Sequence, residues 1–246
     1  MRVLILLSIF LLVASLSVQG APLPPACASA GTYADLEALG STGCVDGDKI
    51  FSDFTLANSA SGDATTPTAA EISYALVPPP PNQWGFDFSG FNLSAIANAT
   101  TPLSFADLTL KYDISVVPGS TQEIDSAEVT LTGSAFDNSA AAISETICVG
   151  QTYIGMCAHP VPLNADAADP TNQVFFTPTT LVGVTKDLSV SAFFAGGVGG
   201  SSHISAFSNT VDQTGVIPEP TLLPLSLVTM GLVCFIAHRR RQGLNQ

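Results

Sequence analysis

The sequence predicts an all-β protein, a β-sandwich of about nine short strands with one short helix near the N-terminus. Apolar and polar residues alternate with a period of two in several runs, most regularly over 108–116. Clusters of Gly, Pro, Asn, Asp and Ser separate these runs at short intervals, which is typical of a sandwich and not of alternating strands and helices. Threonine and valine are frequent in the runs, as they are in strands.

The chain begins with the features of a secretory signal peptide. Met1 and Arg2 precede an uncharged apolar run, 3–18, and the small residues Gly20 and Ala21 follow it. A short basic start, an apolar run and small residues at the cleavage site are typical of export signals. We therefore expect residues 1–20 to be removed and residues 21–217 to form the secreted domain.

One helix is expected, over 32–40. Thr32 is a typical N-terminal cap and Gly40 a typical end. A turn and a strand should follow over 43–54.

Beyond residue 55 the chain consists of strand candidates separated by turns. A loop rich in Ser, Gly, Thr and Pro is expected over 57–69, and the four prolines 78–81 should end the strand before them because proline donates no backbone hydrogen bond. The strand candidates are 71–77, 84–88, 108–116, 124–133, 143–149, 173–177, 181–194 and 203–211.

Aromatic residues are expected to form the core of this domain, because they bury large apolar areas. The expected core aromatics are Trp84, Phe86, Phe88, Phe105, Tyr112, Phe136, Phe175 and Phe193. Trp84 has an alternative interpretation: an exposed indole beside the proline run would offer a flat surface for stacking a sugar ring.

The last thirty residues combine three features in order. Pro218, Glu219 and Pro220 precede an uncharged apolar run, 222–237, and the run is followed by Arg239, Arg240 and Arg241. A transmembrane helix over 222–237 would be about 24 Å long, short of the roughly 30 Å of bilayer hydrocarbon, which favours a transient anchor. The arginines favour a cytoplasmic C-terminus. A permanently anchored single-pass surface protein is the alternative interpretation.

In this order, the tripeptide, the apolar helix and the arginine cluster resemble the PEP-CTERM sorting signal of secreted proteins from exopolysaccharide-producing Gram-negative bacteria. The resemblance covers 218–246, and 33–54 is also similar in pattern to an N-terminal module of such proteins. It implies that exosortase, a membrane-embedded transpeptidase, cuts near the tripeptide after a transient stay in the inner membrane. It further implies a final location in the cell envelope, at the cell surface or in the extracellular matrix, with exopolysaccharide as an expected partner.

The charge of the secreted domain excludes nucleic acid as an expected partner. Four of the seven basic residues lie at the chain ends, so Lys49, Lys111 and Lys186 alone oppose 19 of the 20 acidic residues, a net charge of −16. Such a surface repels phosphate backbones.

Four cysteines remain in the secreted domain, because Cys234 lies in the apolar tail. An even number in an exported protein favours disulfides, and proximity in sequence favours Cys27 with Cys44 and Cys148 with Cys157, although three pairings are possible. A zinc site is disfavoured, because these spacings match no common ligand pattern.

No enzyme motif is found. The sequence has no G-x-S-x-G, no H-E-x-x-H and no P-loop, and His159 and His203 have no evident partner in sequence. Asp46, Asp48 and Asp53 lack the remainder of an EF-hand and are expected to lie in a solvated turn. No catalytic residue, metal or cofactor is therefore predicted. The expected function is a structural or carbohydrate-matrix role, with a secreted glycan hydrolase built from two distant carboxylates as the minor alternative.

Overall fold

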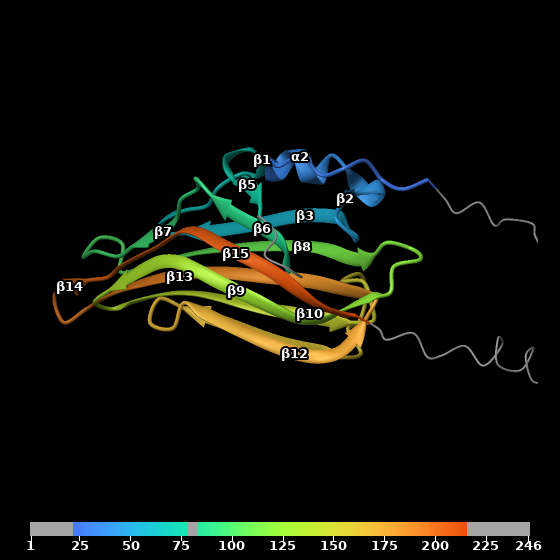
Figure 1. The fold of residues 1–246 in the computed structure, drawn as a ribbon. Helices are drawn as coiled ribbons and strands as arrows, with labels where there is room; N and C mark the ends of the chain where they lie inside the picture. The colour runs from blue at the N-terminus through green and yellow to red at the C-terminus, as the bar shows by residue number, and fades with distance from the viewer. Residues whose placement is uncertain (1–21, 78–82, 216–246) are drawn as a thin grey trace, which may run out of the picture. The chain divides into compact units, whose positions relative to one another are not determined.

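The computed structural model describes residues 22–77 and 83–215. Within them the chain forms two antiparallel sheets of eight and seven strands that pack face to face (Figure 1). The prediction of an all-β sandwich is confirmed for this part of the chain. The expected signal peptide and the transmembrane helix over 222–237 lie outside the described residues.

The seven-stranded sheet is built around β8 and β13, which pair over thirteen residues from Leu103 opposite Phe193 to Ser115 opposite Leu181. Its strands in spatial order are β11 (Pro160–Asp166), β10 (Ser139–Val149), β13 (Leu181–Ala195), β8 (Leu103–Val116), β3 (Lys49–Ser61) and β2 (Cys44–Asp46), with β14 (Val198–Gly199) paired to β13.

The eight-stranded sheet is organised around the last strand, β15. Its strands are β1 (Ala30–Thr32), β5 (Ser73–Leu76), β6 (Gln83–Ser89), β15 (Ser201–Gly215), β7 (Leu93–Ile96) and β4 (Asp63–Thr65), with β9 (Gln122–Phe136) paired to β15 and β12 (Thr171–Thr179) paired to β9. β6 pairs with 207–212 and β7 with 201–204, so these two strands follow one another along one edge of β15. β9 takes the other edge.

The predicted helix is confirmed as α2 (Tyr33–Glu37), with Thr32 as its N-terminal cap. Asp35 Oδ2 accepts hydrogen bonds from Thr32 N and Oγ1, both at 2.8 Å. These bonds stabilise the carboxylate and lower the pKa of Asp35. The Tyr33 hydroxyl reaches into the sandwich and donates to the Thr55 carbonyl oxygen at 3.0 Å, so α2 is fastened to the seven-stranded sheet. Two short 3-10 helices, η1 (Gly40–Thr42) and η2 (Ala69–Glu71), complete the helical elements of the described residues.

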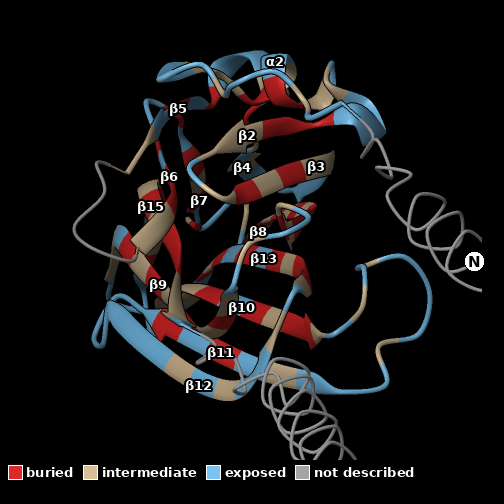
Figure 2. Ribbon diagram, turned by 45° about the vertical axis from the view of Figure 1, so that its right-hand side comes forward, coloured by how far each residue is buried: buried red, intermediate tan, exposed pale blue. Residues whose placement is uncertain are grey.

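The apolar core lies between the sheets, where every second residue of the long strands is buried (Figure 2). Even-numbered residues of β8 and β13 are buried except at Phe194, and Leu108, Leu110, Val184 and Leu188 have no exposed surface. Odd-numbered residues of the same strands form the outer face of the seven-stranded sheet.

A polar network crosses this core. Lys186 on β13 and Glu145 on β10 lie opposite each other in the strand register and form an ion pair, with both side chains fully buried. Asn209, on β15 of the other sheet, donates from Nδ2 to Glu145 Oε1 at 3.2 Å and to the Glu128 carbonyl oxygen at 3.0 Å. The Tyr112 hydroxyl donates to Asn209 Oδ1. The network joins the two sheets by side-chain hydrogen bonds.

Two expectations about the strands are wrong. The expected loop over 57–69 contains the second half of β3 and all of β4, because the chain turns tightly at Gly62, whose φ is 67°. A Cβ at that position would lie 2.4 Å from the Leu103 carbonyl oxygen, so only glycine fits the turn. The strands are also more numerous and longer than expected: the described residues hold fifteen strands in total, and β9, β13 and β15 have 15 residues each.

Candidate functional site

Both predicted disulfides are present. Cys27 and Cys44 are bonded with a Cα–Cα distance of 4.8 Å, and Cys148 and Cys157 with a Cα–Cα distance of 5.5 Å. The first fastens the N-terminal segment to β2, and the second closes the loop between β10 and β11. Disulfides persist in oxidising compartments, which fits an extracellular or secreted protein.

Half of the expected core aromatics are not in the core. Phe86, Phe88 and Tyr112 are buried, and Trp84 is half-buried against the core. The other four are substantially exposed: Phe105 by 40%, Phe193 by 49%, Phe136 by 60% and Phe175 by 72%. Exposed aromatic side chains have to be explained by something other than core packing.

Three of the exposed apolar residues gather at one end of the outer face of the seven-stranded sheet. Leu103 lies directly opposite Phe193 in the β8–β13 register, and Phe105 lies opposite Ser191, so the two phenyl rings belong to diagonal neighbours on one face. Leu103 is 53% exposed. We call Leu103, Phe105 and Phe193 the aromatic patch.

Two rows of small, mostly polar residues run across the strands beside the aromatic patch, all at outward-facing positions. The first row is Ser59, Asp107, Ser189, Ala142 and Asp166, in strand order from β3 to β11. The second row is Ala57, Thr109, Asp187, Ser144 and Asn164. The outer face therefore places hydroxyl, carboxyl and amide groups next to exposed phenyl rings.

Asp107 and Asp187 bring two carboxyl groups together in these rows. Partial burial, and then the Asp187 carboxyl within hydrogen-bonding reach, raise the pKa of Asp107 to about 6. Thr109 Oγ1 donates to Asp187 Oδ1 at 3.4 Å. Around neutral pH this pair presents acceptor oxygens, and below about pH 6 Asp107 also becomes a donor.

The outer face is hollowed on both sides of the carboxyl pair. One hollow, of ≈ 170 Å³, is lined by Ala57, Asn58, Ser59, Asp107 and Thr109. The other, of ≈ 210 Å³, lies over β10, β11 and β13 and includes Ser144, Asn164, Asp187 and Ser189. Both are open to solvent, and polar side chains contribute to the lining of each.

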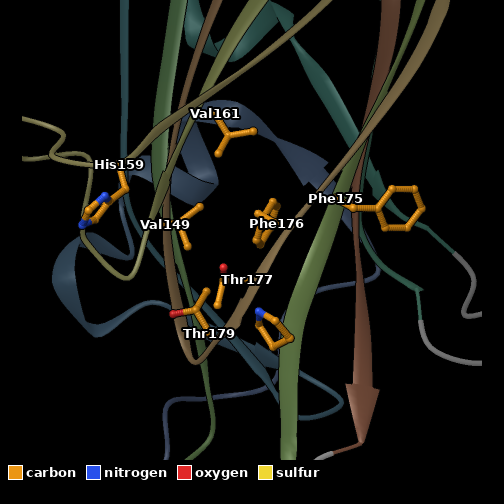
Figure 3. A pocket seen from close by; sticks show the side chains of 8 residues that line it. Val149, His159, Val161, Phe175, Phe176, Thr177 and Thr179 are labelled. Carbon is orange, nitrogen blue, oxygen red and sulfur yellow. The ribbon is translucent and has the colours of Figure 1, made fainter.

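A larger hollow, of ≈ 530 Å³, lies between the edge strands β11 and β12 (Figure 3). Val149, Val161 and Phe176 point into it, whereas the ring of Phe175 points away. The Thr179 hydroxyl is already engaged with the Leu181 backbone at 3.2 Å. This hollow offers apolar surface and few free polar groups, so it is poorly suited to a hydroxyl-rich ligand.

Trp84 is not a free stacking surface. The Lys49 ammonium lies 4.6 Å from the centre of its ring, in a cation–π contact. Gly47 approaches the indole so closely that a Cβ there would lie 2.5 Å from Trp84 Nε1. The indole is occupied by neighbours within the protein.

The remaining polar residues considered in the sequence lie in separate places. His159 borders the large hollow, and His203 Nδ1 lies 2.9 Å from Ser134 Oγ on an exposed surface. Asp48 is held by Lys49 Nζ at 2.6 Å and Ser120 Oγ at 2.8 Å. Across 22–77 and 83–215, no group of three or more His, Cys, Asp or Glu residues is placed to hold a metal ion.

The residues of the expected sorting signal lie outside the described ranges. These are Pro218, Glu219, Pro220, Arg239, Arg240 and Arg241. Among the helices that the structure does describe, none has the length and apolar character needed to cross a membrane.

No protein-family model and no curated protein matches the chain. Solved structures match weakly. TmCBM61 in complex with β-1,4-galactotriose shares 10% identity at a TM-score of 0.28, over 62% of this chain and 86% of that one. The enzymatically active domain of bacteriophage CBA120 tailspike protein 4 shares 11% identity at a TM-score of 0.27, over 63% of this chain and 19% of that one. A variant of the Cel12A cellulase of Rhodothermus marinus shares 14% identity at a TM-score of 0.21, over 64% of this chain and 100% of that one. These scores are too low for an inference about function.

Sequence reasoning missed the outer face. Phe105 and Phe193 were assigned to the core because of their size, although the neighbouring inward positions are taken by Ala106 and Ala192, which are fully buried. The signal that could have revealed their exposure is the alternation of side chains between the two faces of a strand. By this alternation Phe105 lies on the opposite face from Leu108 and Leu110, and Phe193 lies on the opposite face from Leu188 and Val190.

Proposed function

We propose that this protein is an exported, non-enzymatic component of the cell envelope or extracellular matrix that binds a neutral polysaccharide on the outer face of its seven-stranded sheet. The observation that carries this proposal is the aromatic patch beside two rows of hydroxyl, carboxyl and amide groups. Apolar ring faces stack on the C–H faces of sugars, and adjacent donors and acceptors bind the sugar hydroxyls.

The shape of the site supports a chain-like ligand. The two polar rows cross five strands, and neighbouring strands are spaced by about 4.8 Å, so the rows extend over roughly 19 Å. An extended oligosaccharide could lie across them. The small side chains of Ala57, Ser59, Ala142, Ser144 and Ser189 leave the face open to such a chain.

The charge supports a neutral ligand over an anionic one. The secreted domain carries a net charge of −16 by its residue count, and Asp107, Asp187 and Asp166 lie in the proposed site. A polyanion would be repelled from this face, most strongly at low salt.

A binding role is favoured over hydrolysis by the spacing of Asp107 and Asp187, the two carboxyl groups of the site that lie closest together; Asp166 lies two strands away from Asp187. Glycosidases hold their two carboxyl groups about 5 Å or more apart, because a sugar bond or a water molecule lies between them. Asp107 and Asp187 are instead within hydrogen-bonding reach of each other. The secreted glycan hydrolase remains the rival that the assay below distinguishes.

The sorting step belongs to the same proposal. The order of Pro218-Glu219-Pro220, the apolar run 222–237 and the arginines 239–241 supports export, a transient stay in the inner membrane and cutting by an exosortase-type transpeptidase. The length of the apolar run, short for a bilayer, favours this over permanent anchoring.

Binding is tested with the purified exported protein by native electrophoresis through gels that contain a soluble β-glucan, a mannan or the polyanion alginate. We expect retardation by a neutral polymer and none by alginate. Phe105→Ala with Phe193→Ala should weaken the retardation about tenfold or more, since each ring contributes about 1 kcal/mol. Phe136→Ala, which removes a more exposed ring from β9, is the control and should bind normally.

Three results would contradict the binding role: no retardation by any polymer, unchanged retardation of the double variant, or release of reducing sugar from the polymer. The sorting step is tested separately by mass spectrometry of the mature protein's C-terminus. We expect an end near residue 218, and Pro218→Ala with Pro220→Ala should leave the arginines attached. A wild-type surface protein that retains Arg239 to Arg241 would instead indicate permanent anchoring.

A further inference from the structure

The buried polar network contains the parts needed for a covalent bond between the two sheets. Lys186 supplies an amine and Asn209 a carboxamide, and both contact the carboxylate of Glu145. Lys186 Nζ and Asn209 Nδ2 share one oxygen, Glu145 Oε2, so the amine and the amide are separated by no more than two hydrogen-bond lengths. All three side chains are at most 1% exposed.

We propose that Lys186 and Asn209 form an intramolecular isopeptide bond between Nζ and Cγ, with Glu145 transferring the proton. This self-modification links β13 of one sheet to β15 of the other. It does not depend on the proposed polysaccharide-binding function.

The environment makes the amine a nucleophile. Burial lowers the pKa of Lys186 and raises the pKa of Glu145, although their mutual attraction and hydrogen bond oppose both shifts. The neutral amine with a neutral carboxylic acid is therefore favoured more than it would be in water. A neutral amine has the free electron pair that attacks a carbonyl carbon.

The carboxamide is activated on its oxygen side. The Tyr112 hydroxyl donates a hydrogen bond to Asn209 Oδ1. A donor at this oxygen polarises the C=O bond and stabilises the negative charge that develops on the oxygen when Nζ adds to Cγ. On the other side, Nδ2 lies 3.2 Å from Glu145 Oε1 and 3.4 Å from Oε2, which places an acid beside the leaving nitrogen.

The reaction is balanced without another reactant. The Nζ–Cγ bond forms and the Cγ–Nδ2 bond breaks. Glu145 accepts a proton from Nζ and delivers one to Nδ2, which leaves as ammonia, so the carboxyl group is regenerated. Nothing is oxidised or reduced.

The reaction also removes the unfavourable free energy of burying two charged side chains in the core. A buried ion pair loses its hydration, and this cost is often not recovered by the attraction between the charges. After the reaction the core holds a neutral amide and a neutral carboxylic acid in place of Lys186 and Glu145 as ions. The Phe207 ring, whose centre is 5.8 Å from Lys186 Nζ, offers the ammonium a cation–π contact, which replaces only part of the lost hydration.

The bond is tested on the exported protein after denaturation and reduction. Lys186 is the only lysine or arginine between Lys111 and Arg239, so trypsin cuts an unlinked chain after residue 186. In the linked protein Nζ is an amide and trypsin does not cut there. We therefore expect an uncut tryptic product that spans residue 186 and is lighter than its sequence by about 17 Da, the mass of ammonia.

Variants assign the roles of the side chains. Lys186→Met and Glu145→Gln should show the full mass of their own sequences. Lys111→Met, which removes a lysine from the outer face of β8, is the matched control and should keep the loss of ammonia. Tyr112→Phe should form the bond more slowly, seen as a larger unlinked fraction soon after synthesis.

If the Glu145→Gln variant does not fold, the wild-type protein alone tests whether the bond forms. A wild-type protein of full mass that trypsin cuts after Lys186 would overturn the proposal. So would a protein that has lost ammonia but is still cut there, because the loss would then have occurred elsewhere. A folded Glu145→Gln variant that is fully linked would refute the role of Glu145.

Discussion

Asp107 on β8 and Asp187 on β13 hold their carboxyl groups within hydrogen-bonding reach on the outer face of the seven-stranded sheet. Two carboxylates this close repel each other once both are ionised. The pair therefore makes the stability of the sheet dependent on pH.

Asp107→Asn should stabilise the protein above pH 6 and have little effect near pH 4. The pKa of Asp107 is raised to about 6 in the folded protein, so the folded state binds more protons than the unfolded state between about pH 4 and pH 6. The wild-type protein consequently loses stability, relative to the variant, as pH rises through this range. After screening by solvent, we expect a gain of about 1 kcal/mol in the free energy of unfolding at pH 8.

Urea unfolding of both proteins at pH 4 and pH 8 measures this gain. Asp137→Asn, in an exposed turn, is the matched control and should show no such pH-dependent difference. An Asp107→Asn variant that is equally stable or less stable at pH 8 would argue against the rise in the pKa of Asp107 that partial burial and the Asp187 carboxyl cause.

The fluorescence of Trp84 should report unfolding but not polysaccharide binding. It is the single tryptophan of the chain, and its ring is covered by Lys49 and Gly47, away from the aromatic patch. We expect a large change in emission in denaturant and no change on titration with a polymer that retards the protein in gels. A shift in emission on binding would place the sugar at Trp84 instead.

Gly183→Ala should destabilise the loop that Cys148 and Cys157 close. A Cβ at residue 183 would lie 2.1 Å from Tyr153 N, an overlap that the backbone has to relieve by moving. The same movement would weaken the hydrogen bond from Tyr153 N to Asp113 Oδ1, which is 2.8 Å long. We expect a loss of about 1 to 3 kcal/mol in the free energy of unfolding.

Thermal unfolding with limited proteolysis of the loop checks this expectation. Ser191→Ala, at an outward position of the same strand, is the control and should behave as the wild type. Unchanged stability and unchanged proteolysis of Gly183→Ala would mean that the loop does not need this close approach.

Removal of the N-terminal disulfide should cost about 3 kcal/mol. Cys27 and Cys44 are 17 residues apart, and a cross-link of this span restricts the unfolded chain by about that amount. Cys27→Ser with Cys44→Ser should therefore lower the midpoint of urea unfolding. The matched pair Cys148→Ser with Cys157→Ser, which opens a loop with a separation of 9, should cost slightly less. A larger loss of stability from opening the Cys148–Cys157 bond than from opening the Cys27–Cys44 bond would contradict this estimate of the chain-entropy effect.

The fold class could be predicted from the sequence because alternation is a local property. The run 108–116 lies entirely within β8, and the apolar residues Leu108, Leu110, Tyr112 and Ile114 are all buried, as their spacing predicts. Strand pairing is not local. The hairpin at Gly62 was missed because the residues around it are small and polar on both faces, which leaves no alternation to detect.

The polar network was missed for a different reason. Charged residues are expected at the surface, yet Glu145 lies between the buried Ile143 and Ile147, and Lys186 between Val184 and Leu188. The alternation of side chains along β10 and β13 is enough to place both residues on the inward face. That these two side chains meet Asn209, from a strand of the opposite sheet, depends on the packing of the sheets and could not be derived from one sequence.

The position of β15 in its sheet determines how the domain would respond to a pulling force applied at Gly215. This strand ends at Gly215, the last residue that the structure describes, and it is paired with β6 and β7 along one edge and with β9 along the other. A pull directed along the strand from Gly215 would load these ladders in shear, so that many hydrogen bonds resist together and do not open one after another. A domain pulled from this end would in this way resist unfolding.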